Sequence, residues 1–384
     1  MRIAIVSPEV NRSAGVPYYW TALARALTSD HEVHIFAARA DRSGLAGVQF
    51  HRVPAIPIGW SLFHLSFYLV APVVLRLVQL LGRYSFDIVM APGPLVPAAD
   101  LFTIHFVQRR ETQLEAYGAY LSDKQVLGSI RALDYSIYGR FTQWLDSRHM
   151  TSRDRVIAAV SSNVRDDLVD LLGFDQDAVN IVPNGVDPER FQPRNVGKYR
   201  RQLRNGLGIN ADEVVVLFVG NAWGRKGLHS ALDALEHPGL EDLRLVVVGT
   251  GNPALFMKAR TEHVRRRVAF VGPRATDVER YYAMSDVFLL PTLYEPFGLV
   301  VLEAMATGIP AIVSASAGVA ELLHDGVDSL LLEDPTNAGE IAQCLRLLID
   351  APDVAQRLTI NGRLTAERWD WQAVADGLLQ ARAG

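Results

Sequence analysis

The 384-residue sequence contains one cysteine, Cys344, and only four lysines among its 38 basic residues. A single cysteine excludes an intramolecular disulfide and a metal site built from several thiolates, which fits a reducing compartment. The formal charge is −4, so no overall basicity marks nucleic acid as the main partner. We therefore expect a cytoplasmic protein that does not bind nucleic acid.

Only one long apolar run is present, WSLFHLSFYLVAPVVLRLVQLLG over residues 60–82. Its length approaches the roughly 20 residues that a membrane-spanning helix needs. His64, Arg76 and Gln79 interrupt the run and Pro72 lies near its middle, and a central Arg opposes insertion by about 2.5–3.5 kcal/mol. We expect a helix of an α/β domain, with peripheral contact at the inner face of a membrane left open.

Short runs rich in Val, Ile and Leu alternate with longer helical segments along the chain. The N-terminal MRIAIVSPEV, which lacks the long apolar core and cleavage site of a signal peptide, is the first of these runs. Continuous apolar runs are typical of parallel strands that are covered on both faces, and their alternation with helices favours doubly wound sheets. The strand candidates are RIAIVSP, EVHIFAA, FDIVMA, DLFTIHF and RVIAAVS in the first half and VVVLFVG, RLVVVGTG, VAFVGP, VFLLPT and AIVSA in the second.

The series of strands restarts after IVPNGVDPERFQP, where Pro, Asn and Gly punctuate the chain. We predict an α/β fold of two doubly wound, Rossmann-like domains that face each other across a cleft. The first domain would comprise residues 1–190 and the second residues 191–365. Residues 366–384 would form a helix that packs back on the first domain.

Two glutamates flank a predicted helix start in LLPTLYEPFGLVVLEAMATGIP, residues 289–310. Glu295 follows a strand, and Glu303 lies one to two turns into a helix that begins near Phe297 or Gly298. Ligands of open α/β sheets bind at the carboxyl ends of the strands. Free N–H groups of a first helical turn donate to phosphate or hydroxyl oxygens, and carboxylates accept from hydroxyls. The pattern indicates a site for a nucleotide-linked sugar, although an isolated pair would also fit a helix cap and a solvated residue.

Two cations, Arg225 and Lys226, lie in a second turn that follows a strand, FVGNAWGRKGL over residues 218–228. Because they precede Gly227 and a predicted helix, they could clamp a diphosphate. An ordinary exposed basic turn is the alternative reading of these residues.

The Glu-x7-Glu spacing, with Pro-Phe-Gly after the first glutamate, resembles the signature of the family-4 (group 1) retaining glycosyltransferases, which have the GT-B fold. Further stretches carry the same resemblance, namely RVAFVGP, YYAMSDVFLLPT, AGVAELLHDG, LLLEDP, VSSNVRDDL and IVPNGVDPERF. It implies transfer of a sugar from a nucleoside-diphosphate sugar to an acceptor hydroxyl, with retention and without a metal or other cofactor. The base and the acceptor, which could be a glycan, a lipid-linked sugar or a small molecule, stay open. A nucleotide-sugar epimerase or a non-catalytic nucleotide-sugar binding protein is the alternative.

The resemblance also implies roles for individual residues. Glu303 would bind the ribose hydroxyls, and Glu295 would lie near the transferred sugar as a charge-stabilising group or as a nucleophile. Lys226 would bind the diphosphate, so that Glu295, Lys226 and His105 form the expected catalytic set. The other expected donor contacts are Gly15, Asn221, Arg225, Arg274, Phe297, Gly298, Leu299, Val300, Gly318 and Glu321.

The sequence departs from the family pattern at two turns. The family commonly has Arg where this chain has Asn221, so Arg225 would supply the missing positive charge. The turn after the first strand has Gly15 alone where the family has a pair of glycines. His105 matches a family position that contacts the transferred sugar, but a lone His among apolar residues is also typical of a protein core.

Overall fold

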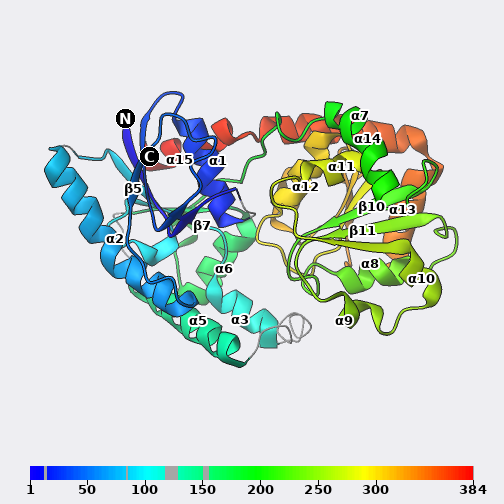
Figure 1. Cartoon of the computed structure of the whole chain (residues 1–384), viewed down its shortest axis with the longest axis horizontal. Coiled ribbons are helices and arrows are strands. Elements are labelled where there is room, and N and C mark those ends of the chain that lie inside the picture. Colours follow the sequence, from blue (N-terminus) through cyan, green and yellow to red (C-terminus); the bar gives the residue numbers. More distant parts are fainter. Residues whose placement is uncertain (13–14, 84, 117–128, 150–154, 384) are drawn as a thin grey trace. The chain divides into compact units, whose positions relative to one another are not determined.

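The computed structural model describes residues 1–12, 15–83, 85–116, 129–149 and 155–383. The chain forms two compact units, each built around its own parallel sheet (Figure 1). Unit 1 comprises Met1–Gln113, Leu127–Asn184 and Trp371–Gly384, and unit 2 comprises Leu114–Val126 and Gly185–Asp370. The predicted α/β class with two doubly wound domains is confirmed.

The unit boundaries differ by a few residues from the ranges expected from the sequence. Unit 2 begins at Gly185 rather than at residue 191, and the chain returns to unit 1 at Trp371 rather than at residue 366. The reason is a pairing between the two crossing segments, in which Val186 N–H donates to the carbonyl of Trp369 over 2.8 Å. Both segments therefore belong to unit 2 up to this point.

Unit 1 has a seven-stranded parallel sheet in the order β5-β3-β1-β6-β7-β8-β9. The last helix of the chain, α15, packs on α1 in this unit. The strands are β1 (Arg2–Val6), β3 (Glu32–Ala37), β5 (Gln49–Arg52), β6 (Ile88–Pro92), β7 (Leu101–Ile104), β8 (Val156–Ala159) and β9 (Val179–Ile181), with the small pair β2 (Glu9–Val10) and β4 (Arg39–Ala40) beside them. The helices are α1 (Val16–Leu27), α2 (Trp60–Gly82), α3 (Gln108–Ala116), α5 (Ser129–His149), α6 (Ser162–Leu172) and α15 (Trp371–Ala383), with short turns η1 (Gly93–Leu95) and η2 (Gln176–Ala178).

Unit 2 has a six-stranded parallel sheet in the order β12-β11-β10-β13-β14-β15. Helices α7, α11 and α12 lie on one side of this sheet and α8 and α9 on the other (Figure 1). The strands are β10 (Val214–Val219), β11 (Leu243–Val248), β12 (Val268–Gly272), β13 (Val287–Leu290), β14 (Ala311–Ser314) and β15 (Leu330–Leu332). The helices are α7 (Arg194–Gly206), α8 (Leu228–Ala234), α9 (Pro253–Met257), α10 (Glu262–Arg267), α11 (Glu279–Met284), α12 (Leu299–Thr307), α13 (Ala338–Asp350) and α14 (Pro352–Arg368), with the short turn η3 (Gly318–Leu322).

The central strands of unit 2 show why the apolar runs form this sheet. All four residues of β13 and five of the six in β10 are buried, as continuous runs of Val, Leu and Phe predict for strands covered on both faces. The strand order reverses between β10 and β13, which pair in parallel. Such a reversal leaves a crevice outside the carboxyl ends of the two strands, where ligands of doubly wound sheets bind.

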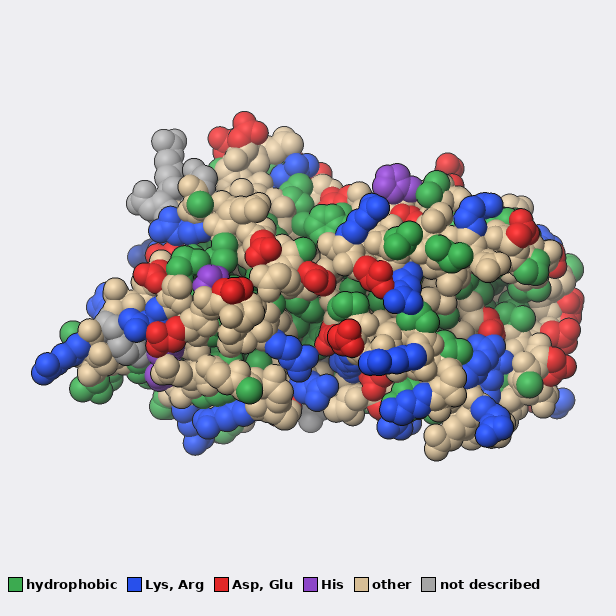
Figure 2. All heavy atoms as spheres, turned by 90° about the horizontal axis from the view of Figure 1, so that it is seen from above, with side chains coloured by type: hydrophobic (Ala, Val, Ile, Leu, Met, Phe, Trp, Pro, Cys, Tyr) green, Lys and Arg blue, Asp and Glu red, His purple; other side chains and the backbone are tan. Residues whose placement is uncertain are grey.

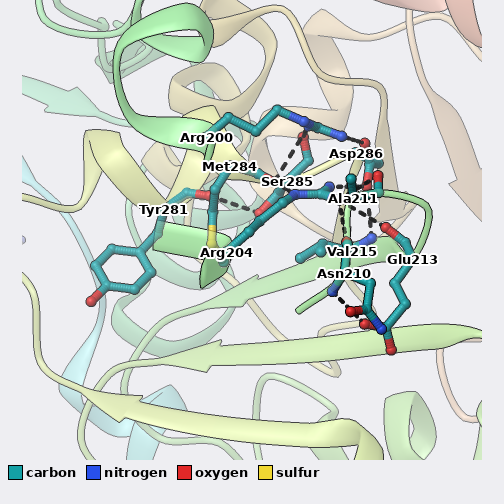
Figure 3. Close-up of polar contacts among 10 residues, drawn as sticks. All are labelled: Arg200, Arg204, Asn210, Ala211, Glu213, Val215, Tyr281, Met284, Ser285 and Asp286. Carbon is teal, nitrogen blue, oxygen red and sulfur yellow. Dashed lines mark hydrogen bonds and ion pairs between the residues drawn. The ribbon is translucent and has the colours of Figure 1, made fainter. Parts of the chain in front are cut away.

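An ion cluster at the opposite, amino end of the same two strands fixes their spacing. Asp286, just before β13, forms ion pairs with Arg200 and Arg204 of α7 and accepts a hydrogen bond from Val215 N–H of β10 over 2.7 Å (Figure 3). Arg204 also donates to the carbonyls of Met284 and of Glu213. The cluster ties α7 to β10 and β13.

Charged side chains of both signs are interspersed on the face seen in Figure 2. This mixture agrees with the small formal charge of −4. That face therefore carries no extended field of one sign.

Candidate functional site

Two loops meet at the carboxyl ends of β10 and β13. Leu293 N–H and the Thr292 hydroxyl both donate to the carbonyl of Arg225, over 2.8 and 3.2 Å. Gly227 has φ +78°, and a Cβ atom there would lie 1.8 Å from the carbonyl oxygen of Pro291. Only glycine therefore allows the two loops to approach this closely.

The contact between these loops brings together two cations and one carboxylate. Lys226 Nζ lies 2.5 Å and Arg225 Nη1 lies 3.3 Å from Glu295 Oε2. Lys226 and Glu295 are only 7% and 9% exposed. Arg225 also donates to the carbonyl of Tyr294 over 2.5 Å, which fixes its guanidinium beside the pair. The sequence predicted that all three residues belong to the site, but not that Lys226 binds Glu295 directly.

The charges of this cluster follow from the balance between burial and attraction. Burial raises the pKa of Glu295, but the neighbouring Lys226 and Arg225 outweigh it and hold that pKa below its ordinary value. Burial lowers the pKa of Lys226, and the attraction of Glu295 opposes this shift. Because two positive groups share one carboxylate, the cluster has a positive excess that attracts an anion such as a diphosphate.

Glu303 lies on α12, in a separate, partly buried environment. The hydroxyl of Tyr282, from α11, donates to Glu303 Oε2 over 2.7 Å. Burial raises the pKa of Glu303, and the Tyr282 hydrogen bond and the charge of Arg190 act in the opposite direction. Arg190 itself forms an ion pair with Glu279 at 3.0 Å. Tyr282 and Arg190 could not be predicted as site residues, because nothing in the local sequence pattern shows which residues approach Glu303.

The N-terminus of α12 lies between the two glutamates. Gly298 has φ +107°, and a Cβ atom there would lie 3.3 Å from Val319 and 3.4 Å from the side chain of Glu295. The helix begins at Leu299, so the N–H groups of Leu299 and Val300 have no partner within the helix. They provide the donors that the sequence predicted at this edge of the sheet.

The turn η3 is hydrogen-bonded to the backbone of Glu295 and Phe297, just before α12. Gly318 N–H donates to the carbonyl of Glu295 over 2.9 Å, and Val319 N–H donates to the carbonyl of Phe297 over 2.7 Å. Gly318 and Phe297 therefore lie beside Glu295, as predicted. Glu321 lies in the same turn and is exposed.

The side chains of Asn221 and Arg274 form hydrogen bonds with nearby backbone groups. The side-chain oxygen of Asn221 accepts from Thr250 N–H over 2.8 Å, which links the ends of β10 and β11. Arg274, after β12, donates to the carbonyl of Val271 over 3.2 Å, and its guanidinium lies 5.5 Å from the ring centre of Tyr281. The side chain of Asn221 thus holds the loop and carries no charge. Arg225 and Lys226 therefore supply the positive charge of this turn.

The two remaining predicted residues belong to unit 1. Gly15 precedes α1 with φ +80°, and residues 13 and 14 of its turn lie outside the described residues. His105 follows β7, and its ring centre lies 4.4 Å from that of Tyr19. Its Nε2 is 3.2 Å from the Thr103 hydroxyl, and burial lowers the pKa of His105 to about 3. The imidazole is therefore neutral at physiological pH.

Metal-binding geometry is a separate question. Among residues 1–12, 15–83, 85–116, 129–149 and 155–383, no group of three or more His, Cys, Asp or Glu side chains could hold a metal ion. Metal-independent chemistry stays a prediction.

Two family models match successive parts of the chain. The model Glycosyltransferase Family 4 matches residues 13–190, and the model Glycosyl transferases group 1 matches residues 200–365, which contain the predicted site residues of unit 2. The chain belongs to the group 1 glycosyltransferases. The resemblance seen in the sequence is thereby confirmed.

Curated relatives of this chain match part of its length. The D-inositol 3-phosphate glycosyltransferase of Xylanimonas cellulosilytica is 32% identical over 249 residues, which is 61% of this chain and 58% of that protein. An uncharacterized glycosyltransferase of Methanocaldococcus jannaschii is 26% identical over 226 residues, 57% of each chain. The chain thus spans less than two thirds of the length of these relatives.

Solved structures match the whole chain at low identity. WaaG, a glycosyltransferase involved in lipopolysaccharide biosynthesis, has a TM-score of 0.73 at 20% identity over 97% of both chains. HepE from Anabaena, in complex with UDP and glucose, has a TM-score of 0.69 at 20% identity, covering 99% of this chain and 98% of its own. Sucrose-phosphate synthase from Thermosynechococcus elongatus has a TM-score of 0.70 at 21% identity, covering 99% and 97%. These likenesses confirm the predicted GT-B fold.

Proposed function

We propose that this chain transfers a sugar from a nucleoside-diphosphate sugar to an acceptor hydroxyl. The observation that carries the proposal is the buried cluster of Arg225, Lys226 and Glu295 beside the open N-terminus of α12. It combines cations, amide donors and a carboxylate at the point where the strand order reverses. A sugar bound to a diphosphate requires all three kinds of group, and membership of the group 1 glycosyltransferases supports the assignment.

In the proposed reaction, Lys226 and Arg225 stabilise the diphosphate as it leaves the sugar. A diphosphate carries more negative charge than one carboxylate, so it competes with Glu295 for Lys226. Glu295, once released, faces the sugar as a hydrogen-bond acceptor and a negative charge close to the reacting carbon. One preorganised donor of this kind contributes about 10²–10³ in turnover.

Glu303 binds the ribose in this proposal. Its Oε2 already accepts from Tyr282, so Oε1 remains to accept from the ribose hydroxyls. The ionised carboxylate accepts from both partners more strongly than the protonated form does. Because burial raises the pKa of Glu303, nucleotide affinity should fall as the pH drops through that pKa.

We further propose retention of the anomeric configuration and a reaction without metal, with the two cations replacing a metal at the leaving group. The acceptor is a hydroxyl of a glycan, a lipid-linked sugar or a small molecule. His105 and Gly15 would contact the sugar or the phosphates from unit 1. UDP is the first nucleotide to test, because the structurally similar HepE was solved with UDP and with UDP-glucose.

The binding test is calorimetry with UDP, GDP and ADP in the presence of EDTA. A charge-assisted contact contributes about 1.5–3 kcal/mol, so Lys226→Ala should weaken the preferred nucleotide about tenfold or more. Lys258→Ala is the matched control, because Lys258 is an exposed lysine at the end of α9 in the same unit. If the folded protein binds none of the three nucleotides, the donor-site assignment is wrong.

The transfer test incubates the bound donor with a panel of acceptor hydroxyls and follows the product by NMR. Formation of a glycoside with the donor's anomeric configuration would support a retaining transferase. Conversion of the donor sugar to its epimer without an acceptor would identify an epimerase instead. Loss of turnover in EDTA would contradict the metal-independent mechanism.

A further inference from the structure

Helix α2 is apolar on two sides, and only one of them is covered. Phe63, Phe67, Ala71 and Leu75 repeat every four residues and are buried within unit 1. A second stripe of large apolar residues faces outward. Its members, each 40 to 74% exposed, are Leu62, Leu65, Leu69, Val73, Leu77 and Leu80. An apolar stripe of this length is unusual for a surface that meets only water.

The neighbouring helix α5 extends this apolar surface. It packs beside α2 at the edge of unit 1 (Figure 1), and Tyr68 of α2 contacts Phe141 of α5 at 5.8 Å between ring centres. Leu133, Ile137 and Trp144 of α5 are 63, 50 and 46% exposed. Because these residues are four and seven positions apart, they lie on one side of α5 and extend the exposed apolar surface of α2.

The charges at this face are positive. Helix α2 contains no Asp or Glu, and Arg76 and the adjoining Arg83 are exposed at its C-terminal end. On α5, Arg140 and Arg148 are exposed, and the guanidinium of Arg148 lies 5.7 Å from the ring centre of Trp144.

The acidic groups of α5 that the structure describes are not exposed. Asp134 accepts from the N–H groups of Trp60 and Ser61, over 2.5 and 3.1 Å, and thereby caps the N-terminus of α2. Asp146 is partly buried, and burial raises its pKa to about 7. Asp134 is thus engaged at the start of α2, at the opposite end of that helix from Arg76 and Arg83.

The topology shows that α2 cannot cross a membrane. By length and composition it qualifies, with 23 residues and a mean hydropathy of 1.8 over its most apolar 18 residues. However, β5 precedes α2 and β6 follows it, and both strands belong to the same seven-stranded sheet. A spanning helix would place these strands on opposite sides of the bilayer. The helix, about 35 Å long at 1.5 Å per residue, must lie along a surface.

We propose that the outer face of α2 and α5 lies on an anionic lipid bilayer. The leucine stripe enters the boundary between headgroups and acyl chains, and the arginines contact lipid phosphates. Trp60, 57% exposed at the start of α2, suits the same interfacial level. A second copy of the chain fits less well, because two such faces would bring arginines together with no exposed acid among the described residues of α2 and α5 to neutralise them.

The test is flotation with vesicles of phosphatidylcholine alone and of phosphatidylcholine with one quarter phosphatidylglycerol. The wild type should float with the anionic vesicles, and Leu69→Glu/Val73→Glu should lower the binding constant at least tenfold. Ile360→Glu/Leu364→Glu on α14 is the matched control, since these residues are 54 and 52% exposed, and it should bind like the wild type. Arg76→Gln/Arg83→Gln should weaken binding about fivefold per arginine, and only to anionic vesicles.

Three results would overturn the proposal. The wild type could stay unbound, or the Leu69→Glu/Val73→Glu variant could float as the wild type does. Sedimentation without lipid could instead show a dimer that this variant dissociates, which would assign the face to a second copy. Nucleotide binding and thermal melting should be unchanged in all of these variants, since the replaced side chains are exposed and none belongs to the donor site.

Discussion

Lys226→Met tests whether the Lys226–Glu295 contact is a true buried ion pair. The two side chains are 7% and 9% exposed and lie 2.5 Å apart. Methionine keeps the length and the apolar stem of lysine but removes its charge. Glu295 would then remain buried with only Arg225, at 3.3 Å, to balance it.

The expected loss follows from the cost of a buried charge that has lost its partner. Removing one member of a buried pair lowers the free energy of unfolding by about 3–5 kcal/mol. For a unit of this size, 1 kcal/mol corresponds to about 2–4 °C in Tm. The melting transition of unit 2 should therefore fall by about 10 °C.

The assay is thermal melting followed by circular dichroism, with Glu295→Gln and the double variant Lys226→Met/Glu295→Gln completing a double-mutant cycle. The double variant should recover part of the lost stability, because it removes the unpaired carboxylate, and Arg225 still donates to the carbonyl of Tyr294. The pKa of Glu295 is lowered in the folded protein, so its ionised form stabilises the fold above its unfolded pKa. This contribution is lost as the pH falls through the folded pKa. The difference between wild type and Lys226→Met should therefore shrink in acid.

Equal melting temperatures for Lys226→Met and the double variant would refute this reasoning. Such a result would mean that water reaches Glu295 in solution and that the pair contributes no more than an exposed ion pair. The role of Glu295 in orienting Lys226 would then have no support from stability.

Three further predictions concern single residues. Tyr282→Phe removes a hydrogen bond to the partly buried carboxylate of Glu303, so calorimetry should show nucleotide binding weakened about tenfold. The loss should be largest in acid, where the carboxylate is easiest to protonate. Unchanged affinity would exclude a role for Tyr282 in positioning Glu303. Gly227→Ala places a Cβ atom 1.8 Å from a carbonyl oxygen, so both nucleotide affinity and Tm should fall, whereas Gly206→Ala, with open space around it, should leave both unchanged. The pKa of His105 is lowered to about 3, so the unfolded chain binds a proton that the folded chain excludes. Melting curves should show that stability declines from pH 6.5 towards pH 3, and that His105→Gln reduces the decline.

Much of the fold could be predicted because its signals are local. The runs VVVLFVG and VFLLPT became β10 and β13, since short, continuous runs rich in Val, Leu and Phe are typical of strands that are covered on both faces. The short strands β9 and β15, of three residues each, were missed because three residues are too few to show a periodic pattern. The unit boundaries shifted because the Val186–Trp369 hydrogen bond joins residues far apart in the chain.

The sequence by itself determined which residue types follow β10 and β13, and so which part of the sheet would carry the cations and the carboxylates. Only the tertiary structure decided which of them touch. Lys226 and Glu295 are 69 residues apart, and Tyr282 and Glu303 are 21 apart on different helices. The same holds for α2, whose sequence shows that it is apolar on more than one side but not which side the rest of unit 1 covers. A local pattern records the chemistry that each residue can offer, but its partner is set by how strands and helices pack, because contact distances depend on the whole assembly.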